Sequence, residues 1–244
     1  VLLKTLAWRS GGLGLLLFWP ALSCGLLSVA YAGWGPRVFS KRTDGTLPLS
    51  TTLLHFPYLG ASWLLWHIDR IIRRETARHE LLPGIWIGRR LLSSELPPEF
   101  DHVVDLTCEF SEPHSIRSRR HYRHFPILDG AEVSGPDLLE LAREIAQYHT
   151  PVYIHCAGGK GRTGMVAAAI VLVLGKAATA AEAITFAESQ RPLISLTRKQ
   201  QRAVERVLYC LRWEQGDDPE YDESFELGPN SGTDSDTGLN PAPK

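Results

Sequence analysis

The sequence predicts an α/β fold with a mostly parallel central sheet flanked by helices, preceded by two transmembrane helices. Short β-branched stretches alternate with longer amphipathic segments after residue 81, which is typical of a parallel sheet. One predicted strand runs through a glycine-rich turn, residues 157–164, into a strongly apolar helix. Two long uncharged stretches precede this region.

The two uncharged stretches are expected to cross a membrane as helices. Residues 11–35 and residues 46–66 carry no charged side chain, and only His55 interrupts the second stretch. Each is long enough for a bilayer core of about 30 Å. Two other interpretations remain open, a signal peptide for the first stretch and a buried amphipathic hairpin for the second. Residues 1–80 are therefore predicted to form a membrane anchor.

Basic residues predict that both ends of this anchor face the cytoplasm. Lys4, Arg9 and the arginines of residues 70–78 lie outside the two apolar stretches, and fewer basic residues lie between them. Because basic residues favour cytoplasmic loops, we expect a multi-pass membrane protein whose folded domain faces the cytoplasm. The net charge of −1 gives no indication of nucleic-acid binding.

Residues 81–213 carry the pattern of one α/β domain. Segments rich in β-branched and aromatic residues predict strands at 85–88, 103–107, 122–128 and 152–154. Apolar residues at helical spacing predict helices at 137–148, 162–174, 178–190 and 197–213. Gly175 is expected to end the second helix and Thr197 to cap the last. Residues 214–244 are acidic and poor in apolar residues, which predicts a disordered tail.

The segment from His155 to Gly164, HCAGGKGRTG, has the clearest chemical signature. It joins a strand to a helix N-terminus, where free backbone N–H groups and the helix dipole attract an anion. Its glycines allow positive φ angles that turn successive N–H groups inward. Cys156 at the base of this positive field is expected to be a thiolate nucleophile. The residues expected to bind a phosphate-like dianion are Ala157, Gly158, Gly159, Lys160, Gly161 and Arg162.

This Cys-x5-Arg-Thr pattern resembles the signature of the cysteine-dependent protein tyrosine phosphatase superfamily. Its HCxxGKGRTG form is similar to the dual-specificity branch, including the phosphatase and tensin homologue, over about residues 82–213. The resemblance implies that Cys156 attacks phosphorus, that Arg162 binds two phosphate oxygens and that Thr163 stabilises the departing sulfur. It also implies that His155 tunes the thiol through hydrogen bonds of the loop. No metal or other cofactor is expected, because arginine and amides supply the positive field.

A carboxylic acid is expected near the loop, because the leaving oxygen needs a proton. The resemblance implies an aspartate on a loop upstream of the cysteine. Asp129 follows the predicted strand 122–128 at a turn signal and is the chosen residue. Asp105, inside a predicted strand, and Asp137, at a helix start, remain as alternatives.

Three functions remain open at this point. The first is hydrolysis of phosphotyrosine, with phosphoserine and phosphothreonine, in proteins. The second is hydrolysis of a phospholipid headgroup such as a phosphoinositide or phosphatidylglycerophosphate, which the positive charge of Lys160 and a membrane anchor would favour. The third is a phosphate-binding scaffold without turnover.

Two further positions are of interest. Some relatives protect an oxidised nucleophile with a second cysteine at about the place of Cys108, and a plain buried thiol is the alternative interpretation. Some relatives also use a glutamine to position the hydrolytic water. Gln200 and Gln201 open the last predicted helix and are candidates, with ordinary surface residues as the alternative.

Overall fold

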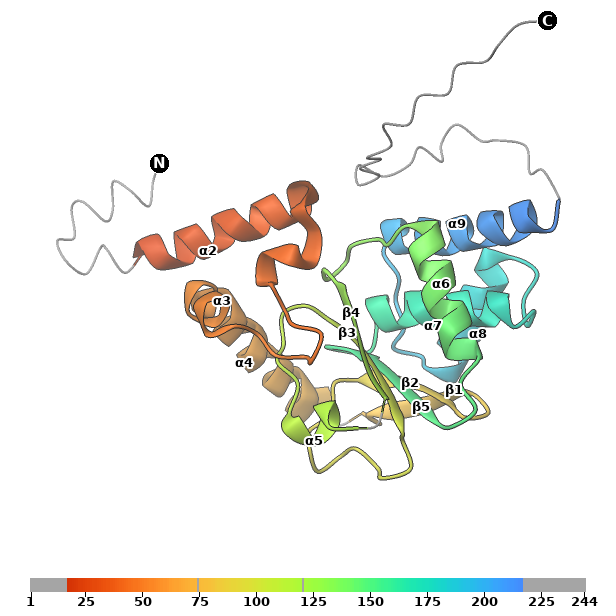
Figure 1. Ribbon diagram of the computed structural model, residues 1–244, viewed down its shortest axis with the longest axis horizontal. Helices are drawn as coiled ribbons and strands as arrows, with labels where there is room; N and C mark the ends of the chain where they lie inside the picture. Colours follow the sequence, from red (N-terminus) through yellow and green to blue (C-terminus); the bar gives the residue numbers. More distant parts are fainter. Residues whose placement is uncertain (1–16, 74, 120, 217–244) are drawn as a thin grey trace, which may run out of the picture.

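A five-stranded mixed sheet forms the centre of the protein (Figure 1). The computed structural model describes residues 17–73, 75–119 and 121–216. Almost all of the predicted tail, together with Lys4, Arg9 and the start of the first apolar stretch, lies outside the described residues. The strands are β1 (Arg78–Leu82), β2 (Ile85–Arg89), β3 (His102–Thr107), β4 (His121–Ile127) and β5 (Val152–Cys156), in the order β1-β2-β5-β3-β4.

The predicted α/β class is confirmed, although the sheet is mixed. Strands β2, β5, β3 and β4 run parallel, whereas β1 pairs with β2 in the antiparallel direction. Strand β1 was not expected from the sequence, because its residues are mostly polar. Leu82 pairs with Ile85, and Gly84 between them has a φ of 80°, so a tight turn joins the two strands. Such a short connection allows only an antiparallel neighbour.

Four helices cover one face of the sheet: α6 (Gly135–Ala146), α7 (Gly161–Val173), α8 (Ala180–Gln190) and α9 (Arg198–Glu214) (Figure 1). Helix α7 lies at the centre of the main apolar core, as its nearly continuous apolar sequence predicts. Thr197 caps α9 through a capping box, and Gly175, with a φ of 63°, follows the end of α7. The predicted helices of the domain are therefore confirmed, with ends that shift by one or two residues.

The opposite face of the sheet has its own apolar cluster. Along β3 and β5, Val104 and Ile154 face the main core, whereas Val103 and Tyr153 pack in the second cluster. This alternation follows from the two-residue period of side chains along a strand. The short helix α5 (His114–Arg117), which was not expected, adds Ile116 to the second cluster.

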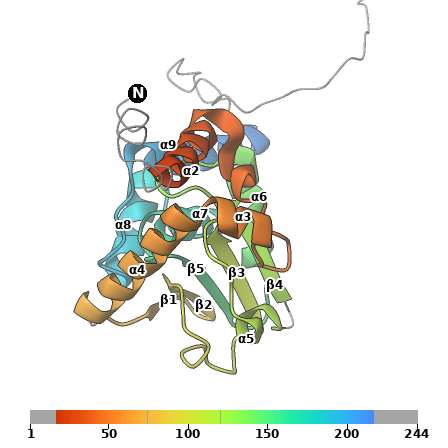
Figure 2. The same ribbon diagram turned by 90° about the vertical axis from the view of Figure 1, so that its left-hand side faces the viewer.

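The N-terminal segment forms a separate layer on the side of the sheet away from α6–α9 (Figures 1 and 2). Its elements are α2 (Phe18–Val29), η2 (Ala30–Trp34), η3 (Gly35–Phe39), α3 (Leu49–Leu54) and α4 (Phe56–Arg73). Helix α2 contacts the α3–α4 junction, where Trp19 stacks on Phe56 at 5.6 Å between ring centroids. Phe39 and Leu59 pack with Cys108 and Leu128 of the α/β domain, so the layer shares a small core with that domain.

No helix in the described part of the chain is both long and apolar enough to cross a membrane. The predicted spans at 11–35 and 46–66 are therefore not supported. In the first stretch, α2 has 12 residues and ends at Val29, and the following segment η2 is interrupted at Gly33, which has a φ of 138°. The second is divided at His55, which separates α3 from α4, and α4 continues into charged residues at Asp69 and Arg70.

A buried ion pair ties the N-terminal layer to the sheet. The Nζ atom of Lys41 lies 2.6 Å from Oδ2 of Asp105, and the two side chains are 1% and 0% exposed. The Tyr122 hydroxyl also donates to Asp105, at 2.6 Å. Burial raises the pKa of Asp105, but the Lys41 ammonium and these hydrogen bonds lower it by more and hold that pKa well below its usual range.

We expect Lys41→Ala to lower the free energy of unfolding by about 3–5 kcal/mol at neutral pH, because it leaves a buried carboxylate without its cation. Since the pKa of Asp105 is depressed in the folded protein, the contribution of the pair is present above about pH 4 and declines as the pH falls through the folded pKa. Urea unfolding at pH 7 measures the first effect, and a series that continues below pH 4 measures the second. Lys176→Ala, on an exposed turn, is the control and should change stability by less than about 0.5 kcal/mol. Equal losses in the two variants would contradict the assignment.

Candidate active site

The glycine-rich loop lies between β5 and α7, as the sequence predicts. Cys156 is the last residue of β5 and is buried, and its sulfur accepts a hydrogen bond from the N–H of Gly159 at 3.2 Å. Within the loop only Gly159 has a positive φ, of 64°, so the expectation that several glycines do so is wrong. Gly159 is also required for space, because a Cβ atom there would overlap the backbone carbonyl carbon of Gly88.

Arg162 is held in a fixed orientation by a carboxylate that the sequence did not reveal. Its Nη1 and Nη2 atoms lie 2.9 and 2.7 Å from the two oxygens of Glu109, and Nη1 also donates to the carbonyl of Ile127 at 3.0 Å. The side chains of both residues are almost completely buried. Burial raises the pKa of Glu109, but the guanidinium lowers it by more, so Glu109 is ionised. The Nε atom of Arg162 has no hydrogen-bond partner among the described residues, which leaves this edge available to an anion.

Side chains from outside the loop donate hydrogen bonds to the carbonyl groups of the loop. Arg191, which is completely buried, donates from Nε to the carbonyl of Gly159 at 2.8 Å and from Nη2 to that of Gly158 at 3.4 Å. The indole of Trp66 in α4 donates to the carbonyl of Ala157 at 3.0 Å. The C=O and N–H of a trans peptide point in opposite directions. Hydrogen bonds that hold these carbonyls away from the centre of the loop therefore help to turn N–H groups toward it, where an anion would bind.

Asp129 lies at the mouth of the site, after the end of β4. One of its carboxylate oxygens is 3.3 Å from Nη2 of Arg162, and its side chain is 71% exposed. The hydroxyl of Tyr31, from the N-terminal layer, donates to the backbone carbonyl of Asp129 at 2.9 Å. The exposed carboxylate therefore lies beside the phosphate-binding arginine, while its backbone is anchored.

The two alternative acids have structural partners elsewhere. Asp105 is completely buried in its pair with Lys41. Asp137 lies in the first turn of α6, where its N–H donates to the hydroxyl of the N-cap residue Ser134 at 3.2 Å. Neither residue lines the cavity next to the loop.

Two expected contacts around Cys156 are not found. The Thr163 hydroxyl donates to the carbonyl of Gly88, at 3.5 Å, rather than to the sulfur. His155 is buried and stacks on Tyr153, but its ring nitrogens have no hydrogen-bond partner among the described residues. The expectation that His155 tunes the thiol through hydrogen bonds of the loop is therefore not met in this structure.

Lys160 of the loop is paired with an aspartate from the N-terminal layer. Its Nζ atom lies 3.4 Å from Oδ2 of Asp69, whose other oxygen binds Arg73. Burial raises the pKa of Asp69, but Arg73 and Lys160 lower it by more, so Asp69 is ionised. The positive charge of Lys160 is therefore partly neutralised within the protein.

A cavity of about 500 Å³ lies over the loop. One wall comes from α4 and includes Tyr58, Leu65 and Trp66. The other wall includes Glu109, Phe110, Asp129, Ala157, Gly158 and Arg162. The N-terminal layer therefore forms part of the candidate active site.

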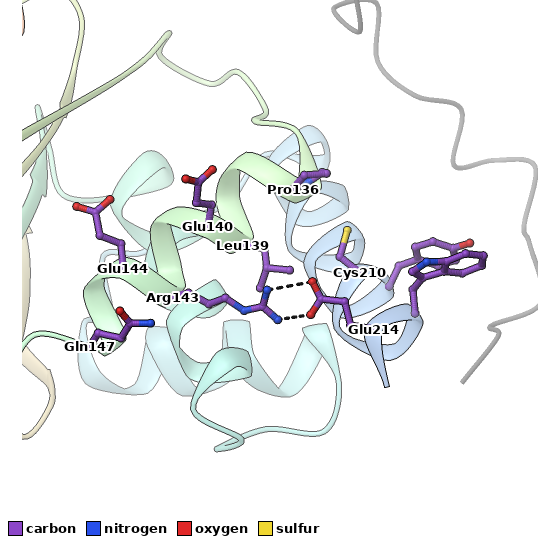
Figure 3. Close-up of a pocket in the computed structure, with 10 residues that line it drawn as sticks. Pro136, Leu139, Glu140, Arg143, Glu144, Gln147, Cys210 and Glu214 are labelled. Atoms are coloured by element: carbon purple, nitrogen blue, oxygen red, sulfur yellow. Dashed lines mark hydrogen bonds and ion pairs between the residues drawn. The ribbon is translucent and has the colours of Figure 1, made fainter. Parts of the chain in front are cut away.

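A larger cavity, of about 640 Å³, lies between α6 and α9 and is distant from this chemistry (Figure 3). Arg143 and Glu214 form an ion pair across it, and Tyr209 and Trp213 also line it. None of the residues predicted to act in catalysis lines this cavity, so we assign it no part in the site.

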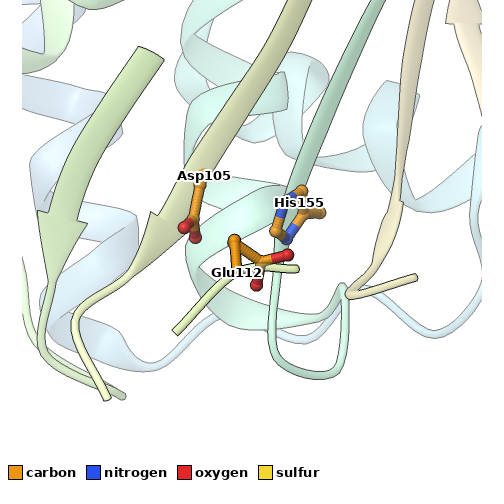
Figure 4. A group of neighbouring side chains, drawn as sticks. All are labelled: Asp105, Glu112 and His155. Carbon is orange, nitrogen blue, oxygen red and sulfur yellow. The ribbon is translucent and has the colours of Figure 1, made fainter. Parts of the chain in front are cut away.

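Asp105, Glu112 and His155 bring possible metal ligands within 4.8 Å of one another (Figure 4). Both acids already face a cation, since Asp105 pairs with Lys41 and Glu112 with Arg90. The cluster is accounted for by these ion pairs, and we assign no metal to it.

The three remaining candidates differ in their surroundings. Gln200 is buried beside the start of α7, and its Nε2 atom has no hydrogen-bond partner among the described residues, whereas Gln201 is exposed. Cys108 is buried and its sulfur contacts the carbonyl of Ile127 at 3.4 Å. Burial, followed by the nearby carboxylate of Glu109, raises the pKa of Cys108, which therefore stays a thiol.

The residues that were missed come from outside the loop. Glu109 could have been found, because it follows β3, and the carboxyl ends of neighbouring parallel strands lie at one edge of a sheet. Arg191, Trp66 and Asp69 had no comparable signal, since each reaches the loop from a helix or helix end that is distant in the sequence.

Comparison with known proteins agrees with this geometry. Residues 96–214 match a family model described as "PTP-SAK: Swiss Army Knife protein, DSP-PTPase phosphatase domain". A mutant form of Tk-PTP has a similar structure, with a TM-score of 0.51 and 24% identity over 56% of this chain and 97% of that one. PTPMT1 in complex with PI(5)P gives a TM-score of 0.50 and 14% identity over 57% of this chain and 99% of that one. A search of curated proteins finds no match.

The family match, together with the cysteine loop that the matched residues contain, indicates a phosphatase. Within that class, the matched residues are similar to the phosphatase domains of the dual-specificity superfamily, as the sequence resemblance implied.

We expect Glu109→Gln to lower kcat/KM by about 10²-fold, because a loosely held Arg162 no longer presents its guanidinium in one orientation. Steady-state kinetics on a soluble phosphomonoester measures the loss. Glu205→Gln, on the exposed side of α9, is the control and should leave kcat/KM unchanged. A Glu109→Gln enzyme with wild-type kcat/KM would show that Arg162 does not need this partner.

Proposed function

We propose that the protein is a metal-independent phosphomonoesterase that acts through a cysteinyl-phosphate intermediate. The observation that carries the proposal is Cys156 at the base of a loop whose arginine is already oriented, with its Nε edge free. Cys156 ends β5 and Arg162 lies in the first turn of α7, so the two residues flank the same loop. This arrangement combines a nucleophile with groups that bind the charge of a transferring phosphoryl group.

In the first step, the sulfur of Cys156 attacks phosphorus. An S–P bond forms as the P–O bond to the leaving group breaks, with the two groups roughly in line. Arg162 and the loop N–H groups bind the equatorial oxygens. Asp129, in its protonated form, gives its proton to the leaving oxygen, and its exposed position suits a leaving group that points out of the loop.

In the second step, water attacks the cysteinyl-phosphate. The carboxylate of Asp129 takes a proton from the water, the S–P bond breaks, and the sulfur leaves as a thiolate while inorganic phosphate is released. The free Nε2 atom of Gln200 is available to hold this water. Thr163 stabilises the departing sulfur by turning its hydroxyl away from the long bond to Gly88.

Phosphorylated proteins, with phosphotyrosine first and phosphoserine or phosphothreonine second, are the substrates that we favour. Tyr58, Trp66 and Phe110 give the cavity aromatic walls that suit a phenyl ring. Lys160 is paired with Asp69, so it offers less charge to a second phosphate group. Both features favour phosphotyrosine over a headgroup with several phosphates.

A phospholipid headgroup is the second candidate, because apolar side chains extend the cavity outward. Leu65, Ile68 and Ile72 line it and are exposed. A lipid with one terminal phosphate, such as phosphatidylglycerophosphate, would place that phosphate on the loop and its apolar part along these residues. The similar structure of PTPMT1 holds the phosphoinositide PI(5)P.

Phosphate release in the presence of a chelator, from phosphotyrosine peptides, phosphoinositides and phosphatidylglycerophosphate, tests the proposal. Preference for the peptides supports the protein substrate, and preference for a lipid supports the second candidate. Release from none of them, with a phosphate analogue still bound, would favour a scaffold without turnover.

The cytoplasmic side is the proposed location of the site, because Cys156 must stay reduced to act as a nucleophile. The four cysteines are free, which fits a reducing compartment.

We expect Cys156→Ser to reduce turnover to background while a phosphate analogue such as tungstate still binds. The hydroxyl is a far weaker nucleophile, whereas Arg162 and the loop N–H groups remain in place. Cys210→Ser, which changes a cysteine in α9, is the control and should keep wild-type activity. Residual turnover above background in Cys156→Ser would remove the cysteinyl-phosphate from the mechanism.

We expect Asp129→Asn to slow hydrolysis of substrates with poor leaving groups by about 10²–10⁴-fold and of good leaving groups much less. A good leaving group departs without protonation, which is the reason for the difference. Initial rates on alkyl and nitrophenyl phosphates measure it. Asp137→Asn and Asp69→Asn should not show this dependence on the leaving group. Equal losses on both substrates in Asp129→Asn would exclude Asp129 as the general acid.

A further inference from the structure

Helix α2 is apolar on all sides and yet largely uncovered. Phe18–Val29 contains no charged residue, and its one buried residue is Ser23. A helix that is apolar all round normally lies inside a protein or in contact with lipid. Nothing in the described part of the chain covers the outer side of this helix.

The exposed apolar side chains of the protein are concentrated in the N-terminal layer. Apart from Leu174 and Trp213, every exposed large apolar or aromatic side chain in the described residues lies between Phe18 and Ile72. They are Phe18, Trp19, Leu22, Val29, Tyr31, Trp34, Leu49, Leu53, Leu54, Phe56, Trp63, Leu64, Leu65, Ile68, Ile71 and Ile72. Exposed apolar groups in such number mark an interaction site, whereas single ones do not.

On α4 these side chains follow the helical repeat. Leu64, Ile68, Ile71 and Ile72 are spaced three to four residues apart and are all exposed, so they form one stripe. Trp66, on another side of the helix, is buried against the loop. One side of α4 thus completes the active site, and another is left without a partner in the described structure.

The composition of the layer fits a membrane surface. Residues 17–73 contain five basic and two acidic residues, and Lys41 is buried in its pair with Asp105, which leaves four basic residues against two acidic ones. Arg37, Arg42 and Arg73 are exposed. Trp34 and Trp63 are more than half exposed, and tryptophan is enriched where a bilayer meets water. Apolar residues next to arginines are typical of segments that lie on anionic bilayers.

A second copy of the chain fits this surface less well. A two-fold contact would place the same patch on both sides and so would bring two positively charged layers together. An anionic bilayer, by contrast, complements the charge and accepts apolar groups over the whole area.

The surface is continuous with the active site. Leu65, Ile68 and Ile72 belong to it and also line the cavity over the loop, together with Asp129 and Arg162. A bilayer against the layer would therefore lie at the mouth of the site.

We propose that α2, α3 and α4 form an interfacial membrane-binding surface, in which their exposed apolar side chains enter the headgroup region of an anionic bilayer. The helices lie on the membrane rather than cross it, in keeping with their lengths and charges. The surface holds the mouth of the active site at the membrane, where the phosphomonoester of the proposed reaction is presented.

Vesicle flotation of the full chain tests this proposal. The probes are phosphatidylcholine vesicles with and without phosphatidylglycerol. We expect the protein to bind the anionic vesicles more tightly than the neutral ones. The double variant Leu64→Glu/Ile71→Glu should bind at least about tenfold more weakly. Each substitution removes the free energy that an apolar side chain gains when it leaves water, and for one such side chain this free energy corresponds to about tenfold in affinity or more. Neither residue lines the active-site cavity.

Leu174→Glu is the matched control, since it places a glutamate at an exposed leucine outside the layer. It should bind vesicles as the wild type does. All variants should hydrolyse a soluble nitrophenyl phosphate at the wild-type rate, which shows that they are folded and keeps the test independent of the proposed reaction.

Wild-type binding by the double variant would overturn the proposal, because residues 1–16 or another surface would then carry the contact. Absence of binding by the wild type, with a dimer in solution that the double variant disrupts, would overturn it in favour of a second copy. If the wild type did not hydrolyse the soluble substrate, that result would contradict the proposed reaction and not the membrane-binding surface.

Discussion

The buried ion pair between Arg162 and Glu109 is the interaction on which the candidate site depends. It joins the first turn of α7 to the end of β3, and Ile127 of β4 adds a carbonyl to the same guanidinium. Burying both charges costs desolvation free energy, and the two hydrogen bonds offset this free energy only when the side chains have one particular geometry. The pair therefore fixes the direction in which the arginine presents its free Nε edge. The pair and the Ile127 carbonyl thus link the ends of β3 and β4 to the arginine of the loop.

The N-terminal layer completes the site rather than merely preceding it. Trp66 binds the carbonyl of Ala157, Asp69 binds Lys160, and Tyr31 anchors the backbone of Asp129. These contacts reach both ends of the site, the phosphate loop and the proposed acid. The segment that sequence patterns mark as a membrane anchor is thus also a wall of the cavity. Its two sides serve different purposes, since one packs on the domain and the other is exposed and apolar.

The sequence was most informative where structure is local. The strand, loop and helix around Cys156 and the cap at Thr197 are each specified by a few neighbouring residues. Strand β1 and Glu109 depend on pairing between distant segments, which periodicity does not show. The apolar stretches at 11–35 and 46–66 have the composition of membrane spans, but Gly33 and His55 divide them. Composition alone could not show these breaks, because glycine and histidine also occur within continuous helices.

The charges around the loop indicate which groups attract the substrate. Each cationic side chain of the loop already faces a resident carboxylate, Arg162 with Glu109 and Lys160 with Asp69. Carboxylates of the protein already neutralise much of the charge of these cations. The cations therefore orient a bound phosphate more than they attract a free one. The remaining attraction comes from backbone N–H groups and the dipole of α7, which no side chain neutralises. Arg191 supports this field without touching the anion site, because it binds the carbonyls of Gly158 and Gly159, and the N–H of Gly159 in the same segment donates to the sulfur of Cys156.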